Sequence, residues 1–204
     1  MKRWNWLAIA VAGAVAVAAP VLAKKNVTRL ELEFTPQQSV ATAEVTLNPA
    51  MQERAVSVRV ADGRPGDREV IGSRTDDDDR RFDLTAGNDV AEFVAASTRQ
   101  QLRTWDVAVG DDADLVLDGK VMSFKVVESN QAVGATYNGS VQVSFELKNS
   151  SGTVLWSGTG SGDATRYGKK FSSDNANEVL SDSLIEALAN LLSNSDLHAA
   201  WSGK

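Results

Sequence analysis

Three long stretches in the second half of the chain alternate apolar and polar residues. They cover residues 115–127, 140–147 and 154–167, and the turn-forming residues 149–152 join the last two. A period of two is typical of a strand with one buried and one solvated face. Because short connections favour neighbouring strands, the three stretches predict an antiparallel meander. The alternation shifts phase around residues 123–127, which indicates a β-bulge or a stretch buried on both faces.

Two other segments have the helical period instead. Residues 89–105 repeat apolar side chains at steps of three and four, and Asp89 is expected to cap the start of this helix. Residues 174–194 carry a wider apolar stripe, and Asn175 is expected at its cap. Both helices are therefore predicted to bury one face against the sheet.

Shorter alternating segments come earlier in the chain. Residues 27–34 and 55–61 predict strands, residues 40–47 repeat the pattern more weakly, and residues 70–72 predict a short return strand. The predicted fold class is α+β, with a single antiparallel-rich sheet and two helices packed on one face. The predicted order is β-(β)-α-β-β-β-α, plus a short N-terminal β extension.

The first 23 residues are interpreted as a secretory signal peptide. Lys2 and Arg3 supply the positive charges, residues 7–19 form an apolar run, and the small residues before Lys24 predict cleavage after Ala23. An apolar run of this length is shorter than the ~20 residues that a membrane-spanning helix needs. An uncleaved N-terminal anchor is the alternative interpretation.

The remainder of the chain is divided into three parts. Residues 24–53 are predicted to be an N-terminal strand or arm, and residues 54–201 the main domain. Residues 202–204 are a C-terminal tail. The pattern leaves open whether residues 24–53 pack on the domain.

Composition excludes several classes of function. The 204 residues include one His and no Cys, so a Cys/His zinc site, a cysteine nucleophile and a disulfide framework are excluded. The net charge of −6 argues against nucleic-acid binding, which needs a basic surface. No cofactor or metal site is expected. A Cys-free, acidic and exported protein suits the bacterial periplasm.

Two acidic clusters invite a calcium hypothesis. Residues 76–79 are four consecutive aspartates, and three more lie within residues 111–114. Both lack the spaced ligands, the turn glycine and the terminal Glu of an EF-hand loop. Solvated loops are therefore predicted, the first one partly neutralised by Arg74, Arg80 and Arg81. Cation binding at residues 76–79 stays open.

Glycine recurs at every second position in the last predicted strand, at Gly158, Gly160 and Gly162. The spacing differs from that of a dinucleotide-binding loop, which needs Gly-x-Gly-x-x-Gly at a turn from strand to helix. On a strand these three positions share one face, so they would let a helix or a partner approach closely. Trp156 precedes them in the same strand, where it either packs in the core or contributes to an interface.

No arrangement typical of catalysis is found. The chain has no Gly-x-Ser-x-Gly elbow and no phosphate-binding loop. His198 lies in a short tail after the last predicted helix, where a surface or packing role is expected. The sequence therefore predicts a protein that is not an enzyme.

Residues 54–201 resemble the YajG family of small bacterial envelope proteins. The resemblance rests on fold signatures rather than on catalytic motifs. They are the strand and turn at residues 56–64, Leu-Thr-Ala at 84–86, Asp-Leu-Val-Leu at 114–117, Tyr137-Asn138, the helix at 179–185 and Asp-Leu-His at 196–198. The resemblance implies a cell-envelope protein without an active site, whose biochemical role is undefined. The expected fold is also similar to that of auxiliary proteins of lipid-transport systems.

One departure from that family changes the expected location. Its members are typically lipoproteins, anchored through a lipidated Cys after the signal peptide, and this chain has no Cys. The resemblance together with this departure predicts a soluble periplasmic protein with no membrane span after signal cleavage.

Two binding functions are considered. In the first, the chain binds another envelope protein through a sheet face that exposes Trp156, Gly158 and Gly160, with Tyr137 from the preceding loop. In the second, it carries a lipid or another apolar ligand. The carrier hypothesis predicts a cavity between helices and sheet, lined by Phe93, Leu102, Leu184 and Leu188.

Overall fold

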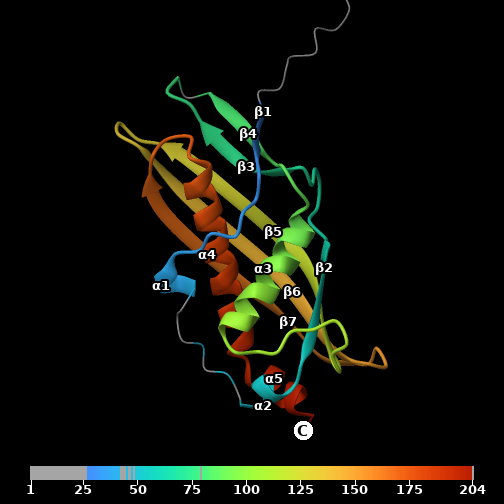
Figure 1. Ribbon diagram of the computed structural model, residues 1–204. Helices are drawn as coiled ribbons and strands as arrows, with labels where there is room; N and C mark the ends of the chain where they lie inside the picture. The colour runs from blue at the N-terminus through green and yellow to red at the C-terminus, as the bar shows by residue number, and fades with distance from the viewer. Residues whose placement is uncertain (1–26, 42–44, 46, 48, 79, 204) are drawn as a thin grey trace, which may run out of the picture.

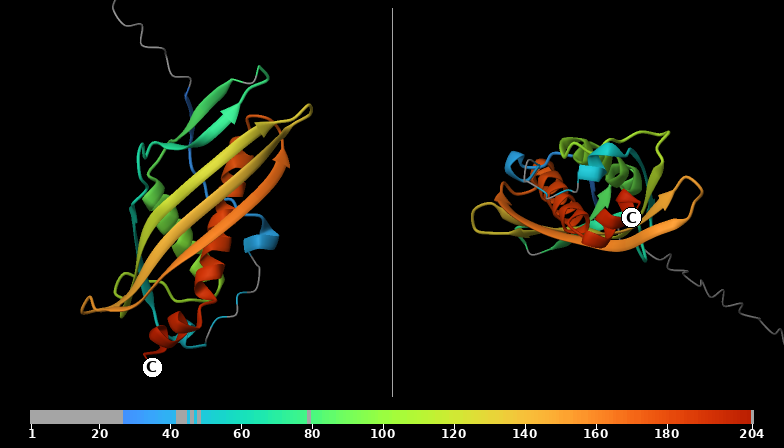
Figure 2. Two further views of the ribbon diagram at one scale, coloured as in Figure 1. Left: turned by 180° about the vertical axis from the view of Figure 1, so that it is seen from behind. Right: turned by 90° about the horizontal axis from the view of Figure 1, so that it is seen from below.

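Seven strands of the described chain form one mixed sheet, and two long helices cover one of its faces (Figures 1 and 2). The computed structural model describes residues 27–203 apart from 42–44, 46, 48 and 79. The strands are β1 (Val27–Leu30), β2 (Val56–Asp62), β3 (Val70–Thr75), β4 (Arg81–Ala86), β5 (Leu115–Asn130), β6 (Ala135–Asn149) and β7 (Val154–Gly168). The helices are α1 (Gln38–Ala41), α2 (Pro49–Glu53), α3 (Val90–Thr104), α4 (Ser173–Leu192) and α5 (Ser195–Ser202).

The sheet is organised around β5, which pairs with two strands placed end to end along one side. β2 runs parallel to residues 115–121 of β5, and β3 runs parallel to residues 126–128. On the other side, β6 pairs antiparallel along the whole of β5, and β7 pairs antiparallel with β6. β4 and then β1 continue the sheet beyond β3. β7 therefore forms one edge of the sheet.

The predicted topology was only partly correct. The α+β class, the antiparallel meander β5–β6–β7 and the cover of two helices on one face are confirmed. The sheet is mixed, however, because β1, β2 and β3 pair in parallel. The strand at residues 70–72 does not return along residues 55–61 but continues past them on β5. Val40, predicted in a strand, lies in α1.

Local signals in the sequence had mixed outcomes. The predicted phase shift is a β-bulge between Val121 and Ser123 in the pairing with β6. Asp89 caps α3 by accepting a hydrogen bond from the Glu92 amide, as predicted. The cap predicted at Asn175 was wrong, because the Ser172 hydroxyl caps α4 instead.

The described part of residues 24–53 packs on the rest of the protein. Leu30, Leu32 and Met51 are buried in the same hydrophobic core as the sheet and the long helices. The segment between β1 and α1, residues 31–37, crosses the outer side of α4 and is called the arm below (Figure 1). The predicted signal peptide and its cleavage site at Ala23 lie outside the described residues.

Candidate functional site

The predicted interaction surface on β7 faces α4, not solvent. A Cβ atom on Gly160 would lie 2.1 Å from the Ala187 carbonyl oxygen, and one on Gly162 would lie 2.2 Å from that of Ser183. The glycines therefore allow the backbone of α4 to approach the sheet closely. The predicted close approach of a helix is confirmed, but the exposure of Gly160 was wrong.

Trp156 and Gly158 belong to the same face of β7. The Trp156 indole lies over Gly158, where a Cβ atom would come within 2.3 Å of the ring. Trp156 is half-buried and packs against the edge of the hydrophobic core. The Trp156 side chain therefore covers Gly158, and the two residues do not form an exposed surface.

Tyr137, the fourth residue of the predicted surface, is fully buried. Its hydroxyl donates to the Lys169 carbonyl at 2.6 Å and accepts a hydrogen bond from the Ser172 amide at 2.9 Å. Burial raises the pKa of Tyr137 above its ordinary value. Tyr137 therefore positions the turn between β7 and α4, and its assignment to an exposed surface was wrong.

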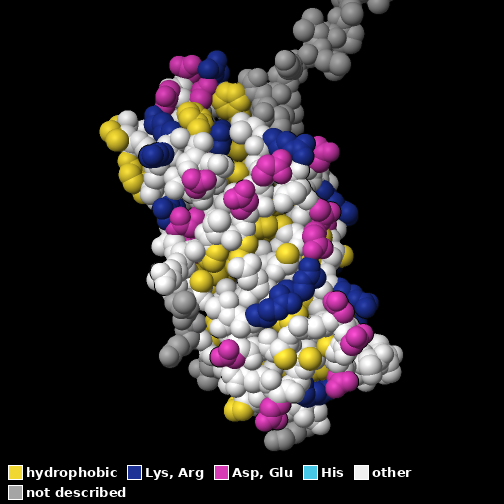
Figure 3. Space-filling view, viewed as in Figure 1, with side chains coloured by type: hydrophobic (Ala, Val, Ile, Leu, Met, Phe, Trp, Pro, Cys, Tyr) yellow, Lys and Arg dark blue, Asp and Glu magenta, His cyan; other side chains and the backbone are white. Residues whose placement is uncertain are grey.

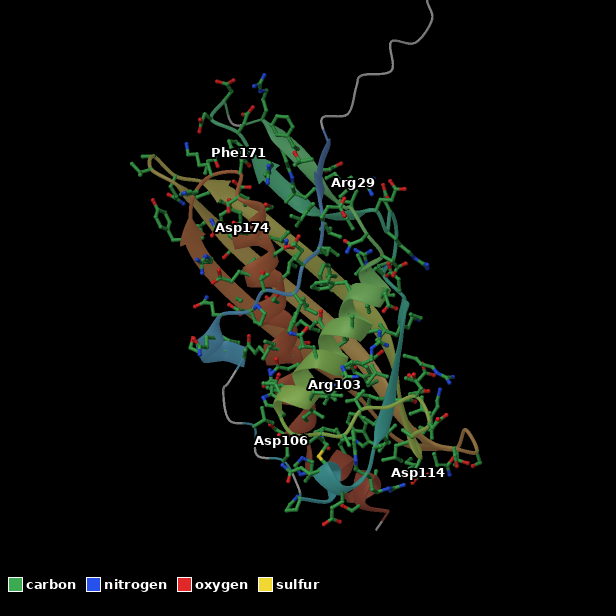
Figure 4. All side chains as sticks on the ribbon, in the orientation of Figure 1. Arg29, Arg103, Asp106, Asp114, Phe171 and Asp174 are labelled. Carbon is green, nitrogen blue, oxygen red and sulfur yellow. The ribbon has the colours of Figure 1, made fainter. Side chains whose placement is uncertain are left out.

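The same turn is held by a buried ion pair. Arg74 Nε lies 3.1 Å from Glu128 Oε2, and the Glu128 side chain is fully buried. The other carboxylate oxygen, Oε1, accepts a hydrogen bond from the Phe171 amide at 2.6 Å. Arg74 also stacks on the Phe171 ring at 5.1 Å. These contacts hold Phe171 at a φ of 57°, a left-handed conformation that is uncommon for aromatic residues. Figure 4 labels Phe171 near the start of α4.

The acidic loop between β3 and β4 forms a tight turn. The Asp76 carboxylate accepts hydrogen bonds from the amides of Asp78 and Arg80 at 2.9 Å and also pairs with the Arg80 side chain. Asp77 pairs with Lys170. No group of three or more metal-ligating side chains occurs among the residues that the structure describes. Asp79 lies outside them, so cation binding at residues 76–79 stays untested.

His198 lies in α5, which continues the chain after α4. Its ring Nε2 lies 2.5 Å from the Leu192 carbonyl at the end of α4. In the same short helix, Leu197 and Trp201 are fully buried. The contacts of His198 are therefore those of a residue that joins two helix ends.

The sheet face that remains open is the opposite one, and it is largely polar. It carries serine, threonine, asparagine and glutamine side chains along β6 and β7. Four of the larger apolar side chains on this face are at least 38% exposed; they are Met122, Val127, Leu155 and Tyr167.

The backbone of β7 is the second open feature, because none of the described strands pairs with its outer side. The Asp163 amide donates to Glu186 Oε2 at 2.8 Å, and Asn190 Nδ2 donates to the Ser161 carbonyl at 2.9 Å. These two groups therefore point away from β6. Since outward groups alternate along an antiparallel strand, the odd-numbered residues 157–167 present their amides and carbonyls outward. We call this row the β7 edge.

The arm is tied to α4 by a row of polar contacts that the sequence analysis missed. Asn177 Nδ2 donates to the Glu31 carbonyl at 2.9 Å, and Ser181 Oγ accepts from the Thr35 amide at 3.0 Å. The next residue, Asp182, accepts from the Gln37 amide at 2.9 Å and from Gln37 Nε2 at 3.0 Å. The sequence contains a signal for these contacts, because small polar residues interrupt the apolar stripe of α4 on the side that faces the arm.

Replacing Asp182 with asparagine should remove a pH dependence of stability. Burial raises the pKa of the Asp182 carboxyl above its ordinary value of 3.8, so the native state holds this proton more tightly than the unfolded chain. The native protein therefore loses stability as the pH rises from 3.8 through the raised pKa. Asparagine stays neutral and can still accept from the Gln37 amide. We expect the difference in melting temperature, Asp182→Asn minus the unmodified protein, to be larger at about pH 7 than at about pH 4. An equal difference at both pH values would contradict this.

The comparisons with known proteins give solved structures of distant likeness and one family model. No curated protein matches the chain. A Xanthomonas campestris protein of known structure is 12% identical, with a TM-score of 0.44, over 87% of this chain and 96% of that one. PelC of Paraburkholderia phytofirmans, solved as a dodecamer, is 22% identical, with a TM-score of 0.34, over 71% and 95%. A Neisseria meningitidis lipoprotein is 18% identical, with a TM-score of 0.37, over 70% and 99%. At these values the likeness does not extend to function.

None of the described helices is both long and apolar enough to cross a bilayer. The family model described as "uncharacterized lipoprotein" matches residues 41–201, which include every long element of the fold. The chain therefore belongs to this family of uncharacterized lipoproteins.

Proposed function

We propose that this chain is an exported accessory protein of the cell envelope, without enzymatic activity, that acts by binding another envelope protein. Membership of a lipoprotein family supports the envelope location. The N-terminal sequence supports export and cleavage after Ala23, which would release the protein into the periplasm. Because the sequence has no Cys, a lipid anchor on a cysteine thiol is not available to it.

The observation that carries this proposal is the β7 edge. An edge strand with free amides and carbonyls is a template for an additional strand, and extended segments of partner proteins bind in this way. The outer-face side chains along it are small and polar at Ser157, Thr159 and Ser161, so they leave room for a neighbouring strand. The partner that fits is an extended segment of another protein.

Helix α4 restricts where that strand can add. Glu186 supplies an acceptor to one outward amide, and Asn190 supplies a donor to one outward carbonyl, which are the groups that a neighbouring strand would provide. These two side chains block pairing at Ser161 and Asp163, as protected edges do in many proteins. Residues 157–159 and 165–167 lie outside this blocked part of the β7 edge, and the proposal places the partner at residues 157–159, where the outward side chains are small and polar.

Replacing Thr159 with proline should block the partner without unfolding the protein. The Thr159 amide points outward, so its loss removes no hydrogen bond to β6, and proline is tolerated at such positions of edge strands. With a photo-crosslinking amino acid at Ser157, we expect the full chain in its host to give a discrete protein adduct. The adduct should fall about 10-fold in Thr159→Pro and persist in Thr159→Ala, which keeps the amide.

The same experiment separates the parts of the proposal. A crosslinker at Ser150, on the exposed turn between β6 and β7, serves as the control position. An unchanged adduct in Thr159→Pro would exclude the β7 edge. The intact mass of the uncrosslinked protein tests export, because cleavage after Ala23 leaves a chain that begins at Lys24.

The alternative function, a carrier of lipid or another apolar ligand, was predicted to use a cavity between helices and sheet. Leu102, Leu184 and Leu188 are packed in the core and at most 1% exposed. Phe93 also lies in the core and is 7% exposed. The seam between helices and sheet is therefore closed at Leu102, Leu184 and Leu188, which favours the protein-binding function.

A further inference from the structure

A groove opens between the arm and the first turns of α3, on the helix side of the molecule. Its volume is about 330 Å³, within the range of small-molecule sites. Leu32 and Phe34 of the arm and Phe93 of α3 supply its apolar lining. Figure 3 shows hydrophobic side chains gathered in the middle of this face. We call this feature the arm groove.

The arm groove exists because the arm is tied to two different helices. Asn88, just before α3, exchanges two hydrogen bonds with the Leu32 backbone, at 2.8 and 3.0 Å. Further along, the arm leaves α3, and its Thr35 amide binds α4. Beyond the arm, the end of α1 returns to α3, where Gln101 Nε2 donates to the Ala41 carbonyl at 2.9 Å. The groove lies between these ties, so it suits a short ligand rather than a segment that runs through it.

A buried hydroxyl lies in the lining of the groove. Ser97 is 1% exposed, and its Oγ has no hydrogen-bond partner among the described residues. Buried polar atoms are nearly always hydrogen-bonded, so an unpaired one needs an explanation. Ser97 lines the arm groove, so a polar group of a ligand bound there supplies the missing hydrogen bond once the Ser97 side chain turns toward it.

The charges at the groove are of one sign. Asp89 and Glu92 line it, and no Lys or Arg of the described chain does. The Asp89 carboxylate accepts from the Glu92 amide, and the Glu92 carboxylate pairs with Arg99 at 2.7 Å. Arg99 is therefore one cation beside two carboxylates. The rim of the groove, formed by Asp89 and Glu92, attracts a positively charged group.

We propose that the arm groove binds a small cationic amphiphile. Its apolar part lies on Leu32, Phe34 and Phe93, and its amine faces Asp89 and Glu92. The amine or a neighbouring polar group of the ligand donates to the Ser97 hydroxyl. This site is independent of the β7 edge, since the arm, Asn88, Asp89 and α3 line it and no residue of β7 does.

The direct test is a series of ligands with the same chain and different head groups. Decylammonium, decanol and decanoate are titrated, below their aggregation concentrations, into the isotopically labelled protein, and amide shifts are followed. We expect decylammonium to bind at least about 10-fold more tightly than decanoate. The largest shifts should be at Phe34 and Ser97. Equal binding of the three compounds, or shifts spread over other surfaces, would overturn the proposal.

Filling the groove provides the matched variants. Ala96 is an exposed residue of α3 that lines the groove, so tryptophan there should block it and lower the affinity for decylammonium at least about 10-fold. Thr104→Trp puts the same side chain on the same helix outside the groove and should bind normally. Gln100→Trp replaces Ala96→Trp if that variant fails to fold. Unchanged affinity in a folded blocking variant would exclude the site.

A charge variant tests the orientation of the ligand. Glu92→Gln keeps the size of the side chain and removes one carboxylate from the rim. We expect the preference for decylammonium over decanol to fall about 3-fold, since exposed charges contribute modestly. An undiminished preference would show that the amine does not face this rim.

Discussion

Replacing Gly160 with alanine should lower the free energy of unfolding by about 3 kcal/mol, the upper end of the usual cost of overpacking. The added Cβ atom would lie 2.1 Å from the Ala187 carbonyl oxygen and 3.1 Å from Leu191 Cβ. The nearest atom belongs to the backbone of α4, which cannot rotate away as a side chain can. The helix must therefore move away from β7, and its contacts with the sheet loosen.

Urea denaturation followed by circular dichroism measures this cost. Gly110→Ala is the matched control, because a Cβ atom there meets nothing within 4 Å and the φ of Gly110 is not positive. We expect the control to stay within about 0.5 kcal/mol of the unmodified protein. If Gly160→Ala were equally mild, α4 would not be packed on the glycines as described.

Replacing Arg74 with methionine should cost about 3–5 kcal/mol of stability, because it leaves a buried charge without its partner. Glu128 is fully buried and pairs with Arg74 at 3.1 Å. Methionine preserves much of the apolar volume of the arginine stem, so the loss reports mainly on the charge. The turn that contains Phe171 should loosen at the same time, since Arg74 stacks on that ring.

The double variant Arg74→Met/Glu128→Gln separates charge from packing. Glutamine is neutral, and its carbonyl oxygen can still accept the hydrogen bond from the Phe171 amide. The double variant should therefore recover at least about 2 kcal/mol of the loss. Equilibrium unfolding of the two single variants and the double variant completes the cycle. No recovery would mean that the cost of Arg74→Met arises from lost packing.

Periodicity predicted the long elements well because burial on one face leaves a regular trace in the sequence. The meander and both long helices came from this signal. The pairing of strands could not be predicted from this signal, since alternation shows that one face of a strand is buried but not which strand lies beside it. The placement of β2 and β3 end to end on β5 depends on the length of β5, and no local pattern in either short strand records it.

The exposure predicted for Gly160 and Tyr137 was wrong for different reasons. One face of β7 carries glycines and the other carries serine and threonine, so neither is apolar and the covered face could not be identified. Tyr137 was different: it continues the buried phase of Val141, Val143 and Phe145 in β6, so extending that strand toward its start would have placed it inside. The arm groove joins segments far apart in the sequence, which no single-segment pattern reveals.

The contacts between the arm and α4 also constrain the order in which the protein folds. The residues they join are about 145 positions apart, as in the bond between the Gln37 amide and Asp182. Contacts this distant in sequence form late, because a long loop must close before they contribute. A chain that emerges N-terminus first cannot dock its arm until α4 has been made. The arm therefore lacks its contacts with α4 until the end of synthesis, a state compatible with the export proposed above.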